Sequence, residues 1–433
     1  MRLLKTLLTA LVLTTPTLHA QGGVPTVMRF DWSIPNYLAE FATAGIVIPA
    51  PPIEVPGLHR FHHGDALPVY TVGAVSFTTV PVPPPPPGEA PAAIRGLFMN
   101  GWTLGSGRFY DLVALADSTE VNSFVIDVKD ATGFITYRSS VPTAVTIGAN
   151  DNLRARSTRE RLALLHEKGI HPIARIVVAR DKLLAERKPH WAVRDDRGGL
   201  WIDGLGDPWV DAYNDSVWIY AAELAAEAVL MGFKEIQFDY LRFPDERGER
   251  MRHAVFGARQ NKESRRSAIR RQVTLLRDRV KPLGVPFTLD VFGLSMTATN
   301  DMGIGQYWED LSPLADVLLP MVYPSHYPRG SYGISFPNAD PYETIRRALQ
   351  DGIRRSESIP NAAKIRPYLQ AFSIRGVRYT SDLLRAQIQA AEDLGITGWV
   401  FWNARGVYPA DAFRPAAPDL NAPAATEEWS RER

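Results

Sequence analysis

Eight short apolar runs recur along the chain after residue 92, separated from one another by longer polar or amphipathic stretches. They cover residues 93–98, 121–128, 170–178, 234–238, 285–291, 317–322, 365–372 and 396–401. The runs do not alternate between apolar and polar residues, which is typical of parallel strands that helices cover on both faces. The pattern therefore predicts a parallel sheet.

Helices are predicted between these runs. Residues 157–169, 214–232 and 381–395 each begin with a capping side chain, carry an apolar stripe and end in a glycine just before the next run. Strands that alternate with helices in this way are typical of α/β proteins, and eight such strands can close into a barrel. The sequence thus predicts a (β/α)8 TIM barrel over residues 93–415.

The chain outside residues 93–415 differs in composition. Residues 1–20 have the basic start, apolar stretch and small-residue end of a secretory signal peptide, so we expect export to the periplasm or the extracellular space. Residues 81–92 are rich in proline and predict an extended linker. Residues 21–80 form a small Pro-rich appendage without an assigned role, and residues 416–433 predict a flexible tail. No further apolar run is long enough to span a bilayer.

Overall composition excludes several classes of protein. A hydrophobic content of 45% with 22% charged residues is ordinary for a globular chain. The balance of 48 basic against 47 acidic residues gives no electrostatic reason to expect a nucleic-acid partner. Without cysteine the chain has no disulfides, and without a Gly-rich phosphate loop it predicts no cofactor. His59, His62, His63 and Asp65 stand without a second cluster of ligands, so no metal site is predicted.

Carboxylates stand at the ends of the predicted strands, where barrel enzymes carry their active sites. Asp239 ends the fourth run and Asp290 ends the fifth, and two acids on neighbouring strands can form the pair that glycoside hydrolysis uses. We expect Arg242 to keep Asp239 ionised. Both acids also have a structural interpretation, Asp239 as a cap or as the ion-pair partner of Arg242, and Asp290 as a buried acid that orients Arg242.

Further polar and aromatic residues follow the other strands. Strand alternation would direct Asp127 and Lys129 toward the barrel mouth, where they could bind sugar hydroxyls, although a structural ion pair explains them equally well. Tyr323, His326 and Trp402 follow the sixth and eighth runs. Rings with polar tips are suited to stacking on sugars and positioning them, with ordinary packing as the alternative.

These strand-end motifs resemble those of a bacterial domain family, DUF4015, a former domain of unknown function grouped with glycoside hydrolases. The similar segments are RGL (95–97), IDVKD (126–130), FDYLRFP (238–244), DVFG (290–293) and PMVYPSHY (320–327). The resemblance covers residues 95–405 and implies a distant relation to α-amylase-type (β/α)8 glycosidases. It also implies that Asp239 is a nucleophile and Asp290 the acid of the fifth strand. The chain departs from the α-amylase pattern, since Gln237 replaces an arginine and Asp290 a glutamate, which leaves the proton donor and the stereochemistry open.

Together these features predict an exported glycoside hydrolase that cleaves an oligo- or polysaccharide with a pair of carboxylates, Asp290 being the proton donor. The alternative is a non-catalytic carbohydrate-binding barrel of the cell envelope, because a fold does not guarantee an activity. Convergence of Asp239 and Asp290 on one cavity would favour the enzyme, whereas an ion pair that holds one of them away from this cavity would favour the binding protein. A third hypothesis is an envelope scaffold that docks a partner through the Pro-rich segments.

Overall fold

The computed structural model describes residues 90–246 and 248–416. Several predictions concern residues that lie outside this part: the signal peptide (1–20), the appendage (21–80) with His59, His62, His63 and Asp65, nearly all of the linker (81–92) and of the tail (416–433). Within the described part, no helix combines the length and the apolar character that crossing a bilayer requires.

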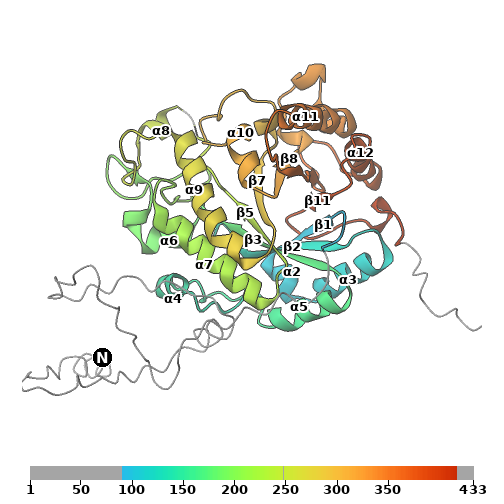
Figure 1. Cartoon of the computed structure of the whole chain (residues 1–433), viewed down its shortest axis with the longest axis horizontal. Coiled ribbons are helices and arrows are strands. Elements are labelled where there is room, and N and C mark those ends of the chain that lie inside the picture. Colours follow the sequence, from blue (N-terminus) through green and yellow to red (C-terminus); the bar gives the residue numbers. More distant parts are fainter. Residues whose placement is uncertain (1–89, 247, 417–433) are drawn as a thin grey trace, which may run out of the picture. The chain divides into compact units, whose positions relative to one another are not determined.

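Parallel strands form a closed barrel (Figure 1). They are β1 (Arg95–Met99), β2 (Ser123–Lys129), β3 (His171–Val177), β5 (Glu235–Asp239), β7 (Phe287–Phe292), β8 (Val317–Met321), β9 (Lys364–Ile365), β10 (Tyr368–Gln370) and β11 (Trp399–Trp402). Each pairs with its neighbour in the order β10-β11-β1-β2-β3-β5-β7-β8-β9, and a further pairing of β10 with β8 closes the ring. Because β9 and β10 are two parts of one strand, the ring has eight strands, and the predicted (β/α)8 barrel is confirmed.

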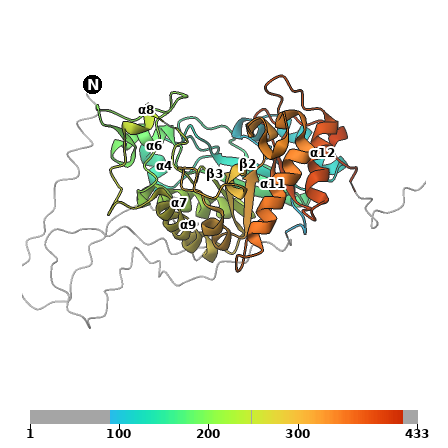
Figure 2. The same ribbon diagram turned by 90° about the horizontal axis from the view of Figure 1, so that it is seen from above.

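Helices connect the strands and surround the barrel (Figures 1 and 2). They are α2 (Gly101–Gly105), α3 (Arg108–Ser118), α4 (Pro142–Ile147), α5 (Thr158–Glu167), α6 (Lys182–Arg187), α7 (Asp215–Met231), α8 (Glu249–Arg252), α9 (Arg265–Val280), α10 (Trp308–Leu311), α11 (Pro341–Ser356) and α12 (Ser381–Glu392). A short antiparallel ribbon of β4 (Arg194–Asp195) and β6 (Ala254–Val255) lies outside the ring.

Helix α7 illustrates how the sequence defines these boundaries. The side chain of Asn214 accepts a hydrogen bond from the backbone N–H of Ser216 and so caps the first turn. At the other end Gly232 adopts φ 120°, a conformation that side chains disfavour, and its N–H bonds to the last carbonyls of the helix. The chain then enters β5 within three residues.

One seam of the barrel is interrupted. β8 pairs with β9 at two positions and with β10 at one, whereas β7 and β8 pair at five. Pro367 lies between β9 and β10, and a proline has no N–H to give to a strand ladder. The closing strand is therefore split into two short pieces.

Two apolar layers make up the core. A large cluster fills the space between the strands and the helices. A smaller one fills the inside of the barrel and includes Phe98, Val125, Ile173, Leu319 and Val400. Since successive side chains of a strand point to opposite faces, the residues two positions further along β2 and β3 also point inward. Those residues are polar, and they begin the candidate site.

Candidate active site

A layer of polar side chains lies above the inner apolar layer, toward the carboxyl ends of the strands. Asp127 follows Val125 in β2, and Arg175 follows Ile173 in β3, directly opposite Asp127 in the strand register. Asp239 ends β5 and Asp290 lies near the end of β7. Four neighbouring strands thus bring three carboxylates and one guanidinium to the end of the barrel that carries active sites.

Arg175 joins the three carboxylates. Its Nη1 lies 2.5 Å from Oδ1 of Asp127, its Nη2 donates to Oδ2 of Asp239, and its Nε lies 3.6 Å from Oδ2 of Asp290. Only 4% of Arg175 is exposed, so the interaction takes place largely out of contact with water. Asp239 and Asp290 therefore converge on the same guanidinium.

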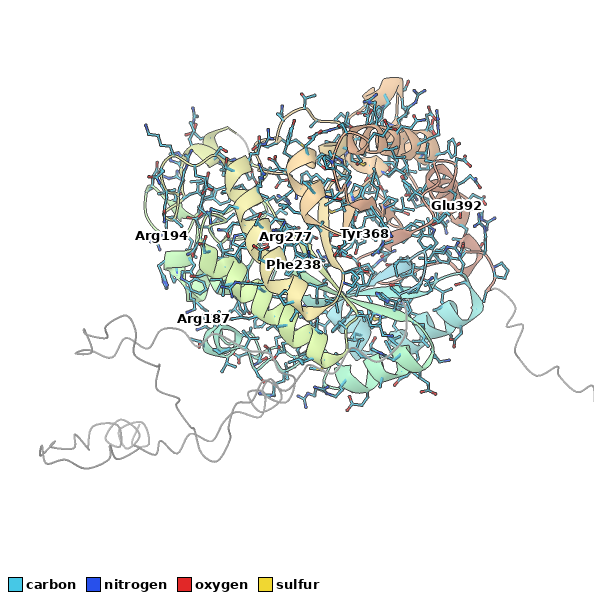
Figure 3. All side chains as sticks on the ribbon, viewed as in Figure 1. Arg187, Arg194, Phe238, Arg277, Tyr368 and Glu392 are labelled. Atoms are coloured by element: carbon cyan, nitrogen blue, oxygen red, sulfur yellow. The ribbon has the colours of Figure 1, made fainter. Side chains whose placement is uncertain are left out.

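Asp290 is the most deeply buried of these acids, with 1% exposure. Its Oδ2 accepts a hydrogen bond from Nε2 of Gln237, which also lies 3.0 Å from the hydroxyl of Tyr368 in the barrel (Figure 3). Burial, and next the charge of Asp239, raise the pKa of Asp290 well above its usual value. Oδ1 of Asp290 is buried and has no hydrogen-bond partner among the described residues. A protonated carboxyl with a free oxygen can serve as a general acid.

Asp239 is held in a different way. Besides the contact with Arg175, its Oδ1 accepts a hydrogen bond from the N–H of Tyr240, 2.5 Å away. Tyr240 has φ 55°, which a bulky residue rarely adopts and which turns the chain sharply after the strand. With 7% of its side chain exposed, Asp239 is more accessible than Asp290. Asp290, whose pKa is raised, thus lies beside a carboxylate that a guanidinium holds, and the two acids have different environments.

Asp127 completes the acidic group. Burial raises the pKa of Asp127 to about 6 although the neighbouring Arg175 acts to lower it. Of its side chain, 5% is exposed. Asp127 is thus a buried member of the acidic group with a raised pKa.

Arg242 does not contact Asp239, so the expectation that it holds this carboxylate is wrong. Its Nη1 lies 3.0 Å from Oδ1 of Asp245, and its guanidinium lies over the rings of Tyr240 and Phe292. Arg175 forms the ion pair with Asp239 that was expected of Arg242, and the sequence analysis did not identify Arg175. The available signal was a charged residue in the middle of an apolar run, where charges are rarely found unpaired.

Lys129 also departs from its expected position. The register of β2 against β3 shifts between Asp127 and Lys129, as at a β-bulge, and the simple alternation of side chains ends there. Nζ of Lys129 lies 2.5 Å from Oδ2 of Asp181, and both side chains are almost fully buried. It also lies 5.6 Å from the ring centroid of Tyr220 in α7. Lys129 is therefore part of a structural ion pair between the sheet and a helix, and not of the mouth.

The three predicted aromatic residues lie near the acids. Trp402 stacks on Phe98, with 3.7 Å between ring centroids, and the guanidinium of Arg175 lies 5.0 Å from its ring. The ring of Tyr323 lies 5.4 Å from that of His326. Burial raises the pKa of Tyr323 well above its usual value, and so do the charges of Asp290 and Asp239. Their role in binding sugar stays a prediction.

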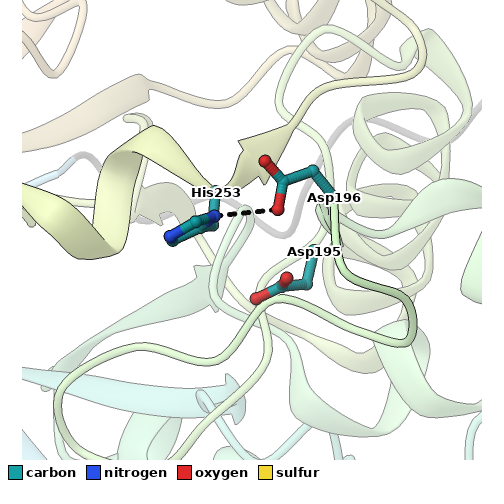
Figure 4. Close-up of side chains that lie close together, drawn as sticks. All are labelled: Asp195, Asp196 and His253. Atoms are coloured by element: carbon teal, nitrogen blue, oxygen red, sulfur yellow. Dashed lines mark hydrogen bonds and ion pairs between the residues drawn. The ribbon is translucent and has the colours of Figure 1, made fainter.

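A separate group of possible metal ligands lies at the β4–β6 ribbon (Figure 4). Ligand atoms of Asp195, Asp196 and His253 lie within 4.8 Å of one another, and Nδ1 of His253 is 2.8 Å from Oδ1 of Asp196. Arg197 already donates to both oxygens of Asp195, and the group is partly exposed. Carboxylate and imidazole groups are common cation ligands, but exposed acids often pair without an ion, so we assign this group no function.

Comparisons with known proteins cover the same part of the chain. A family model described as "Putative glycosyl hydrolase domain" (DUF4015) matches residues 96–408. No curated protein sequence matches the chain. The match to the family model extends from β1 past β11, and so includes the whole barrel.

Several solved structures are similar to this chain. A hypothetical protein from Ruminiclostridium thermocellum is 36% identical, with 42% of this chain and 91% of that chain covered and a TM-score of 0.38. An α-galactosidase from Thermus thermophilus in complex with stachyose is 17% identical (75% and 64% covered, TM-score 0.44). A chitinase from Chromobacterium violaceum is 13% identical (74% and 97% covered, TM-score 0.44). Since these TM-scores lie below 0.5, we draw no function from the likenesses.

Proposed function

Because this chain belongs to the family described as "Putative glycosyl hydrolase domain", we propose that it is an exported glycoside hydrolase that cleaves an oligo- or polysaccharide. The observation that carries the proposal is the convergence of Asp239 and Asp290 on Arg175. Two carboxyl groups that contact one guanidinium are separated by no more than the ~9 Å that glycoside hydrolysis tolerates. Export is proposed from the signal-like residues 1–20.

In the proposed reaction, Asp290 gives its proton to the glycosidic oxygen while the bond from that oxygen to the anomeric carbon breaks. Asp239 either attacks the anomeric carbon or stabilises the positive charge that develops there. Water then completes the hydrolysis, and its proton returns to Asp290. Arg175 fixes the direction of the carboxylate of Asp239 and offsets its charge. The burial and the neighbouring charge that raise the pKa of Asp290 support its role as the acid.

The sugar itself would be held at the mouth. Trp402 is partly exposed, with one face against Phe98, and offers ring surface on which the C–H face of a sugar can stack. Tyr323, the second stacking candidate, is 8% exposed. His326 and Asp127 offer polar atoms for its hydroxyls. We propose a carbohydrate, and not a nucleic acid, as the partner of this site.

The test compares the purified full chain with its Asp239→Asn variant on α- and β-linked glycans and on amino-sugar polymers, with reducing ends measured. We expect the parent to release reducing ends and Asp239→Asn to lose about a thousandfold or more in rate, as when a nucleophile is removed. Asp245→Asn is the matched control, because Asp245 lies on the same loop and pairs with Arg242 away from the acids. It should keep the parent's rate.

Thermal unfolding of all three proteins separates loss of chemistry from loss of the fold. Equal rates in the parent and Asp239→Asn would refute the role of Asp239. If no protein released reducing ends while parent and variant bound the same glycan, the non-catalytic carbohydrate-binding hypothesis would replace the hydrolase.

A further inference from the structure

A small cavity lies beside the loops that follow β8 and β10. Its volume is about 180 Å³, and its lining includes Ser325, Arg329, Phe336, Asn338 and Arg375. This is less than the ~300–1,000 Å³ of pockets that enclose a drug-sized ligand, so it suits one sugar unit rather than a longer piece. Ser325 and Asn338 are 2% exposed each, and they give the cavity a buried polar side.

The charge of this cavity is positive. None of its seven lining residues is acidic. Nη1 of Arg375 donates to the backbone carbonyl of Ser325 over 2.5 Å, and the guanidinium of Arg329 lies 4.5 Å from the ring centroid of Phe336. Within residues 90–246 and 248–416, neither arginine forms an ion pair with a carboxylate. Both guanidinium groups are thus positioned by neutral contacts and keep N–H donors and charge for an anion.

The backbone at Arg375 is unusual as well. Arg375 has φ 52°, in the left-handed region that disfavours residues with side chains. It precedes Gly376 in a tight turn that Ile374 and Val377 close by bridge pairing. Such conformations are unfavourable for residues with side chains and occur preferentially at functional sites.

The cavity is joined to the acid pair by two residues. Oγ of Ser325, on the cavity side, lies 3.0 Å from Nδ1 of His326. The ring of His326 contacts that of Tyr323, whose hydroxyl is influenced by the charges of Asp290 and Asp239. The cavity and the acids therefore belong to one end of the barrel.

We propose that this cavity is a subsite for an acidic sugar, in which Arg329 and Arg375 bind the carboxylate of a uronic acid. A planar guanidinium matches a carboxylate through two parallel hydrogen bonds, which a neutral sugar cannot accept in the same way. An amino sugar would bring a positive charge toward two others and be rejected. The proposal rests on the proposed function and narrows its substrate to uronic-acid-containing polysaccharides.

The test measures binding by calorimetry to the full chain carrying Asp239→Asn, so that turnover does not interfere. The probes are trimers of galacturonate and of mannuronate, each compared with the same trimer after reduction of its carboxyl groups to alcohols. At least one uronate trimer should bind about tenfold or more tightly than its reduced form, because hydrogen bonds to charged groups are among the strongest. Adding Arg375→Gln should remove this preference.

Arg378→Gln is the matched control, since Arg378 lies three residues further along the same loop but does not line the cavity. It should keep the preference within about twofold, as expected for an exposed charge. Equal binding of uronate and reduced trimers, or equal losses in the Arg375 and Arg378 variants, would overturn the subsite. If the uronate trimer binds more tightly than its reduced form but the parent hydrolyses no glycan, the subsite is supported and the hydrolase is rejected. If the parent hydrolyses a glycan but shows no preference for uronate, the hydrolase is supported and the subsite is rejected.

Discussion

Replacing Arg175 by methionine tests the organisation of the acid cluster. The guanidinium is the group that joins Asp127, Asp239 and Asp290, and it is 4% exposed. Methionine retains much of the volume of the arginine stem but leaves three buried carboxyl groups without a cation. We expect a loss of stability that depends strongly on pH.

The size of the loss follows from the burial. Removing one partner of a buried ion pair typically costs roughly 3–5 kcal/mol. The pKa of Asp127 is already raised from 3.8 to about 6 with Arg175 present, and roughly 1.4 kcal/mol corresponds to each pKa unit. A carboxyl whose pKa is raised on folding stabilises the protein fully below pH 3.8, and this stabilisation is lost as the pH rises through the folded-state value. Without Arg175 the pKa of Asp127 and that of Asp290 should rise further. Above pH 6 the free energy of unfolding should therefore fall more steeply with pH in the variant than in the parent.

The measurement is urea denaturation at pH 4.5 and pH 7.5, followed by the fluorescence of the chain's 10 tryptophans. Arg175→Met should lower the free energy of unfolding by roughly 3–5 kcal/mol at pH 7.5 and by less than half of that at pH 4.5. Arg277→Met, which breaks a pair with Asp278 that is mostly in solvent, should cost about 1 kcal/mol or less at both. A loss for Arg175→Met that is equal at both pH values would refute the reasoning.

Three further predictions concern other groups of the barrel. Asp290→Asn should reduce kcat/KM about a hundredfold or more, and the rate of the parent should fall as the pH rises through the raised pKa of Asp290. A pH–rate profile of both proteins tests these expectations. An unchanged rate in the variant would contradict the role of Asp290 as proton donor. Glu235 is paired with Arg366, and the pKa of Glu235 is lowered from 4.5 to about 2. Glu235→Gln should therefore lower the free energy of unfolding by roughly 3 kcal/mol at pH 7. The difference in stability between parent and variant should shrink below pH 4.5, because the stabilisation by Glu235 is lost as the pH falls toward 2. Urea denaturation in which this difference grows on acidification would contradict the prediction. Lys129→Met should lower the free energy of unfolding by roughly 3–5 kcal/mol, because Asp181 stays buried without its cation. Adding Asp181→Asn should recover part of this loss in the same assay.

The barrel and its two acids were predictable because the evidence for them is local. Continuous apolar runs give the positions of buried parallel strands, and the first carboxylate after such a run lies at the mouth. Asp239 and Asp290 were therefore located correctly from sequence. The signal-like and Pro-rich segments could be recognised as different, but the structure does not describe them.

The partners of these acids were not predictable, because they depend on register and on turn geometry. Arg242 is three residues from Asp239, but the left-handed conformation of Tyr240 directs the chain away, and Arg242 lies with Asp245. Arg175 is 64 residues from Asp239 and meets it only because β3 and β5 are neighbours in the sheet. For Lys129 the sequence left both the mouth and a structural ion pair open, and the ion pair is the one found, because a register shift interrupts the alternation that would direct Lys129 to the mouth.

The split closing strand has a consequence for how the mouth accommodates its contents. β8 pairs with β9 at two positions and with β10 at one, so beyond Pro367, toward the mouth, a single paired position joins the two sides of this seam. Tyr323 and the Arg329 loop follow β8, and the Arg375 loop follows β10, so the two sides of the cavity belong to the two sides of the seam. Local opening is least costly where few backbone hydrogen bonds break. Widening at this place would leave Asp239 and Asp290, which lie on β5 and β7, in register.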